Sequence, residues 1–114
     1  MLTLDSLRAF GANVDEGMGR CINNEAFYLR MVNSGLNDPN FDKLDKAMEE
    51  NDAKAAFEAV HALKGTTGNL ALTPIYEPIC EMTEKLRKQS VMPDVALLYE
   101  QVRSALADAR KLLD

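Results

Sequence analysis

The chain has 114 residues, the size of one domain, and 46% of them are apolar, so it can bury a core without disulfides or a metal. Charged residues make up 27%, and the formal net charge is −5. Because nucleic-acid binding and electrostatic attachment to membranes both need a basic face, this acidic balance argues against both. We expect one stand-alone domain over residues 1–114 that is a monomer in solution, since its surface is acidic and of mixed charge.

The sequence predicts neither a membrane span nor a metal site. Its uninterrupted apolar stretches are a few residues long, far short of the ~18 that cross a bilayer. The first residues, Met1–Asp5, lack the basic segment and apolar run of a secretory signal, so we expect a cytoplasmic protein. Cys21 and Cys80 form no CxxC pair and there is one histidine, so we expect reduced thiols and no bound metal.

The N-terminal third predicts helices. Leu4, Leu7 and Phe10 have the spacing of a short helix that ends at Gly11. Asn13 is placed to cap a second short helix. The residues expected to face inward from this second helix are Val14, Met18, Cys21 and Ile22. A longer helix is predicted from Asn24 onward, with one apolar stripe formed by Phe27, Tyr28, Met31, Val32 and Leu36.

The remaining sequence predicts four longer helices joined by short turns, over residues 39–51, 52–71, 74–89 and 94–113. Asp38-Pro39 and Thr73-Pro74 are typical of an N-cap followed by the first helical residue, and Asp52 is a third N-cap. Each of these four helices has a set of residues at helical spacing that we expect to face the core. In chain order the sets are Phe41, Leu44 and Met48; Ala53, Ala56, Phe57, Val60, Leu63, Thr67 and Leu70; Ile75, Ile79, Met82 and Leu86; and Val95, Leu98, Val102, Leu106, Ala109 and Leu113. Short connections favour antiparallel neighbours, so the predicted fold is all-α, an antiparallel four-helix bundle with one or two additional short N-terminal helices.

The single histidine lies in an unusual part of this pattern. His61 falls about 100° around the helix from the core residue Val60, and therefore faces outward. The same face carries Gly65 and Gly68, and Lys64 flanks it. Two glycines inside a helix cost about 2 kcal/mol relative to alanine, and close approach of another molecule is one reason to keep them.

An exposed imidazole, whose ordinary pKa is about 6.5, is a nucleophile near neutral pH. A neighbouring ammonium group would offset the negative charge of an attached phosphoryl group. This arrangement suits an imidazole that accepts and donates a phosphoryl group against a docked partner. Spacing alone leaves an alternative open, in which Gly65 ends the helix, residues 66–72 form a loop and His61 is a last-turn histidine favoured by the helix dipole.

Residues 61–71, HALKGTTGNLA, resemble the signature of the histidine phosphotransfer (HPt) family of two-component phosphorelays. That signature is approximately His-x-Leu-Lys-Gly followed by small residues, an apolar residue and usually a glycine. In motif and spacing the resemblance covers residues 39–88. It implies an HPt-like four-helix bundle whose exposed histidine takes a phosphoryl group from the aspartyl phosphate of a receiver domain and passes it to another receiver.

By position, the resemblance makes His61 the phospho-acceptor and Lys64 its supporting charge. The expected landing surface for the partner is Phe57, Lys64, Gly65, Gly68 and Tyr76. On the resemblance, Gly65 would provide the gap that admits the receiver, and Gly68 would extend it. Phe57 and Tyr76 also fit the bundle core, and a ring at its edge could serve both purposes.

The expected partners are response-regulator receiver domains, with a hybrid sensor histidine kinase as a further candidate. The receiver is expected to supply Mg²⁺, and this chain to bind no cofactor. The sequence has no GxxxxGK[ST] loop, so we expect a phosphocarrier intermediate without ATP-dependent kinase activity. Two alternatives remain: a helical adaptor that docks receivers or other signalling proteins without transferring phosphate, and an unrelated helical bundle that oligomerises.

Two positions depart from the family pattern. Ala71 stands where a glycine is usual, and because alanine is small we expect close helix packing to survive. Pro78 follows Pro74 by four residues, where a regular helix needs its N–H. This predicts a bend or an irregular first turn in that helix, which would alter the docking surface beside His61.

Overall fold

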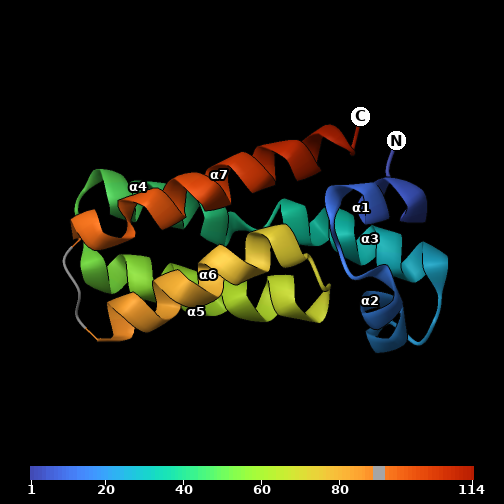
Figure 1. Cartoon of the computed structure of the whole chain (residues 1–114), viewed down its shortest axis with the longest axis horizontal. Helices are drawn as coiled ribbons and strands as arrows, with labels where there is room; N and C mark the ends of the chain where they lie inside the picture. Colours follow the sequence, from blue (N-terminus) through green and yellow to red (C-terminus); the bar gives the residue numbers. More distant parts are fainter. Residues whose placement is uncertain (89–91) are drawn as a thin grey trace.

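The computed structural model describes residues 1–88 and 92–114 of the chain. These residues contain seven α-helices and one 3₁₀ turn (Figure 1). The helices are α1 (Leu4–Phe10), α2 (Val14–Arg20), α3 (Glu25–Leu36), α4 (Pro39–Glu49), α5 (Ala53–Asn69), α6 (Thr73–Arg87) and α7 (Ala96–Lys111), and the 3₁₀ turn is Met92–Val95. These residues contain no strand. None of their helices combines the length and the apolar character that a membrane span needs.

Helices α4 to α7 form a bundle in which consecutive helices pack against one another. Its core is apolar and includes the fully buried side chains of Leu44, Val60, Leu63, Ile79, Met82 and Val102. Helices α1 and α2 lie at one end of the molecule, close to both chain termini (Figure 1). This arrangement confirms the predicted all-α bundle with short N-terminal helices, to which α3 adds a longer one.

The aspartate caps agree with the prediction. The Asp38 side chain accepts a hydrogen bond from the backbone N–H of Asn40 at the start of α4. The Asp52 side chain accepts one from the backbone N–H of Ala55 at the start of α5. These carboxylates satisfy amide groups that have no partner within the helix and favourably face its positive end.

The turn between α5 and α6 differs from the prediction. Thr73 is the first residue of α6 rather than its cap, and Leu72 occupies the N-cap position without a side-chain hydrogen bond. The physical reason lies one residue earlier, where Ala71 is buried with φ +55°, in the left-handed region. A glycine at position 71 would adopt this left-handed conformation without strain. We expected the small size of alanine to matter for helix packing, but Ala71 lies in the turn between two helices, where the backbone conformation is the constraint.

The N-terminal helices hold this turn in place. The backbone N–H of Asn13 donates to the carbonyl of Ala71 at 2.9 Å. The hydroxyl of Tyr28, a fully buried residue, donates to the carbonyl of Leu70 at 2.9 Å. Burial raises the pKa of Tyr28 to about 12, so the hydroxyl keeps its proton at neutral pH. Gly17 makes room for the ring, because a Cβ there would lie 2.6 Å from it.

Several apolar side chains that we expected to face inward are exposed. In α3, Tyr28, Val32 and Leu36 are buried, but Phe27 and Met31 are 37% and 39% exposed. Other helices therefore cover only the face of α3 that carries Tyr28, Val32 and Leu36, and the apolar stripe that we predicted was wider than this buried face. Ile22 is 81% exposed because it lies beyond α2, with a left-handed φ of 53°. Ala53 is exposed in the first turn of α5.

The predicted boundaries of the last two helices also change. Helix α6 is continuous from Thr73 to Arg87 with Pro78 buried inside it, so Pro78 does not interrupt the helix. Gln89, at the end of the predicted range, lies outside the described residues. The final helix begins at Ala96, after the 3₁₀ turn, rather than at residue 94.

We expect Ala71→Gly to raise the free energy of unfolding by about 0.5–1 kcal/mol, as measured by urea denaturation. Glycine removes a left-handed strain of about 1–2 kcal/mol, partly offset by its larger conformational entropy in the unfolded chain. Asn51→Gly is the matched control, since Asn51 has φ 58° but asparagine tolerates this conformation. An equal gain at both positions would contradict the explanation.

Candidate functional site

Helix α5 carries the histidine and runs without interruption from Ala53 to Asn69. Both Gly65 and Gly68 lie inside it, so the alternative in which Gly65 ends the helix is wrong. His61 is therefore a mid-helix residue, and its side chain is exposed. This agrees with the outward orientation expected from the apolar periodicity.

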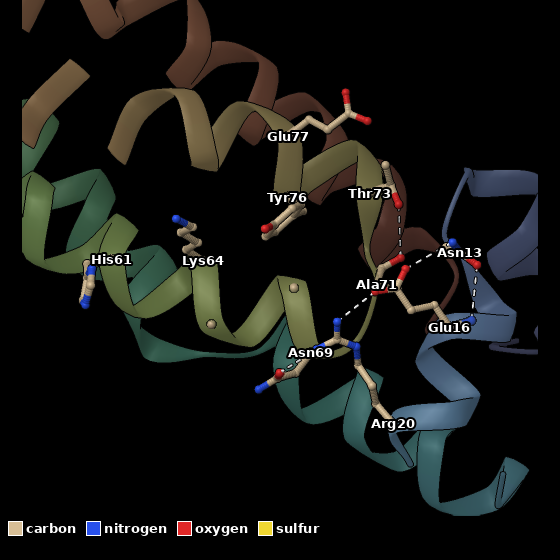
Figure 2. Close-up of a pocket in the computed structure, with 12 residues that line it drawn as sticks. Asn13, Glu16, Arg20, His61, Lys64, Asn69, Ala71, Thr73, Tyr76 and Glu77 are labelled. Atoms are coloured by element: carbon tan, nitrogen blue, oxygen red, sulfur yellow. Dashed lines mark hydrogen bonds and ion pairs between the residues drawn. The ribbon is translucent and has the colours of Figure 1, made fainter. Parts of the chain in front are cut away.

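A surface groove of about 700 Å³ lies between α5, α6 and the N-terminal helices (Figure 2). Five of the six residues singled out from the sequence line it, namely His61, Lys64, Gly65, Gly68 and Tyr76. The sixth, Phe57, does not. The other lining residues, which the sequence did not point to as site residues, are Asn13, Glu16, Arg20, Asn69, Ala71, Thr73 and Glu77.

Phe57 lies beside the histidine, one helical turn before it. The two rings stack with centroids 5.8 Å apart and an angle of 24° between their planes. The guanidinium of Arg87 in α6 lies 6.0 Å from the Phe57 ring centroid. Phe57 is half-buried. Its contact with the imidazole limits the orientations of that ring, while the His61 side chain stays exposed to the groove.

The two glycines of α5 have different surroundings. A Cβ at Gly65 would meet nothing within 4 Å, so the surface there is open. A Cβ at Gly68 would lie 2.9 Å from Cε1 of Tyr76. Gly68 thus lets the tyrosine ring pack closely on α5. Because that ring fills the space beside it, Gly68 does not extend the open gap at Gly65 as we expected. The pKa of this tyrosine is raised by its interaction with the Cys80 side chain, so its hydroxyl stays protonated at neutral pH.

One wall of the groove comes from the start and end of α2. Arg20 forms an ion pair with Glu16 at 2.9 Å, and its guanidinium donates to the Asn69 side chain at 3.4 Å. The side-chain amide of Asn13 donates to Glu16 at 3.2 Å. No local sequence signal marks these residues as site residues, because their position depends on how α2 packs against the α5–α6 turn.

The groove thus presents an exposed imidazole, a half-buried lysine one turn away and an open glycine surface between them and the far wall. Among residues 1–88 and 92–114, no group of three or more His, Cys, Asp or Glu side chains could hold a metal ion. Chemically, the imidazole can act as a nucleophile toward a group that another molecule brings to it.

We expect Gly65→Ala to stabilise the protein by about 1 kcal/mol, because alanine is a better helix former and its methyl group meets no other atom. Gly68→Ala should stabilise it less or not at all, since the Tyr76 ring must move. Urea unfolding of both variants measures the difference. Equal stabilisation would contradict the distinct surroundings described for the two positions.

A family model described as Hpt domain matches residues 37–112, which is more than half of the chain. No curated protein and no solved structure gives a match. The match begins just before α4 and ends just after α7, so it spans the whole four-helix bundle and includes the histidine-bearing helix. Members of this family are phosphocarrier modules of phosphorelays that interact with the receiver domains of response regulators. The chain belongs to the Hpt domain family.

Proposed function

We propose that His61 accepts a phosphoryl group from the aspartyl phosphate of a response-regulator receiver domain and passes it to a second receiver. The observation that carries the proposal is the position of His61. It is exposed in the middle of α5, at a groove where Gly65 leaves the neighbouring surface open. A receiver can therefore bring its aspartyl phosphate to the imidazole without displacing a side chain at that glycine.

The transfer needs only the imidazole as nucleophile from this chain. A lone pair on the ring nitrogen, Nε2 by analogy with the family, forms the N–P bond. The bond between phosphorus and the aspartyl oxygen breaks, and its electron pair stays on the receiver carboxylate. Onward transfer reverses these roles at the second receiver. The receiver would supply the Mg²⁺ that balances the phosphate charge.

Lys64 and Phe57 have supporting roles in this proposal. The ammonium of Lys64, which lines the same groove one turn beyond His61, would offset the negative charge of phosphohistidine. The stacked ring of Phe57 would hold the imidazole in position. Gly65 and Tyr76 belong to the surface that the receiver contacts.

The direct test is to incubate the chain with Mg²⁺ and receiver domains that carry labelled phosphate, using receivers from the same genome. We expect label on the wild-type chain and none on His61→Gln. The label should be lost in acid and kept in base, as a phosphoramidate is. Because His61 is exposed, the substitution should leave the fold intact, which circular dichroism checks.

Other results of this assay would contradict the proposal. Binding of a receiver without any transfer of label would favour a non-transferring adaptor. Label that persists on His61→Gln would place the acceptor elsewhere in the chain.

Gly65→Leu tests whether close approach matters. Leucine favours the helix but projects into the open surface beside His61, so we expect a folded protein whose transfer rate falls about 100-fold because the reacting groups are held apart. Ala62→Leu is the matched control, since Ala62 is also exposed on α5 but does not line the groove. Transfer at the wild-type rate by folded Gly65→Leu would eliminate the role of Gly65.

A further inference from the structure

The wall of the groove that α2 contributes lies outside the matched family region, which begins at residue 37. We propose that Arg20, at the end of α2, pairs with an acidic side chain on the docked receiver and so helps to determine which receivers bind. The inference rests on the proposed function, because it requires a receiver to dock over His61.

The distance along α5 places Arg20 within a docked surface but away from the transferred group. Its guanidinium contacts Asn69, which is eight residues beyond His61, or about 12 Å along the helix axis. A protein interface of standard size covers about 800 Å² on each partner, which corresponds to a radius of about 16 Å. An interface of this size centred on His61 therefore extends past Asn69, the residue that the Arg20 guanidinium contacts. Both residues line the same groove, near its opposite ends (Figure 2).

The guanidinium of Arg20 is available for a new partner. Its side chain is 51% exposed, and its ion pair with Glu16 is also exposed, which makes that pair a weak contribution to stability. A guanidinium has five N–H donors, and the contacts to Glu16 and Asn69 use two. Arginine binds carboxylates through two parallel hydrogen bonds, so an aspartate or glutamate is the side chain it fits best.

The hydrogen bonds at the α2 end of the molecule argue against a purely structural role for Arg20. The α2 end of the molecule is already held by the two 2.9 Å hydrogen bonds that Asn13 and Tyr28 donate to the carbonyls of Ala71 and Leu70. The contact from Arg20 to Asn69 is longer, 3.4 Å, and exposed. The local charge matters too: Lys64 and Arg20 line the groove together with Glu16 and Glu77, and the guanidinium at its rim offers a positive charge to an acidic side chain of the partner.

The test measures binding and transfer separately. Each receiver domain from the same genome is titrated by calorimetry against wild type, Arg20→Ala and Arg20→Glu at low and high salt. The receiver that binds wild type most tightly is then used for single-turnover transfer at saturation. Arg8→Ala is the matched control, because Arg8 is also 51% exposed and ion-paired near the N-terminus but does not line the groove.

We expect Arg20→Ala to weaken binding about five- to tenfold and Arg20→Glu to weaken it further, with a smaller loss at high salt. The transfer rate at saturation and the melting temperature should match wild type, as should all properties of Arg8→Ala. Changing a receiver carboxylate about 12 Å from its phosphorylated aspartate to lysine should restore binding to Arg20→Glu, since the charges are then exchanged.

Wild-type affinity in both Arg20 variants would overturn the inference while leaving the proposed function intact. A fall in melting temperature that accompanies the loss of affinity, with no restoration by the exchanged charges, would assign Arg20 a structural role and also overturn it. Binding that depends on Arg20 without transfer of label to wild type would instead support the inference and contradict the proposed transfer reaction.

Discussion

The turn between α5 and α6 sets the geometry on which the rest of the site depends. The chain reverses there through a left-handed Ala71, and the carbonyls of Leu70 and Ala71 are each bound by a group from the N-terminal helices. Because the Leu70 carbonyl and the Tyr28 hydroxyl are both buried, losing their hydrogen bond would leave polar groups without a partner in the interior. The turn therefore fixes α6 against α5 and fixes α2 against both.

The groove beside His61 is a consequence of that turn. Once α6 is fixed, Tyr76 lies over Gly68, and this contact closes the surface at one glycine while the other remains open. Once α2 is fixed, Glu16 and Arg20 form the far wall. The two glycines look alike in the sequence, yet one allows two helices to pack closely and the other leaves a surface that another molecule can approach.

This arrangement separates two tasks along one helix. In the proposed function, the chemistry stays within about one turn of His61, where Phe57 and Lys64 lie. The recognition that we infer takes place about 12 Å away, on a wall supplied by a helix outside the family match. A change in α2 could then alter partner choice without altering the nucleophile, because the two regions touch the receiver at different places.

The sequence by itself determined the helices of the bundle, the caps at Asp38 and Asp52, and the outward face of His61. These features depend on local periodicity and on side chains that bond to nearby backbone. Only the tertiary structure decided that α5 continues through Gly65, that Ala71 is left-handed, that Phe27 and Met31 are exposed and that Arg20 reaches the groove. Each of these depends on which surfaces of distant helices meet, and a periodic pattern shows that a face is apolar without showing what covers it.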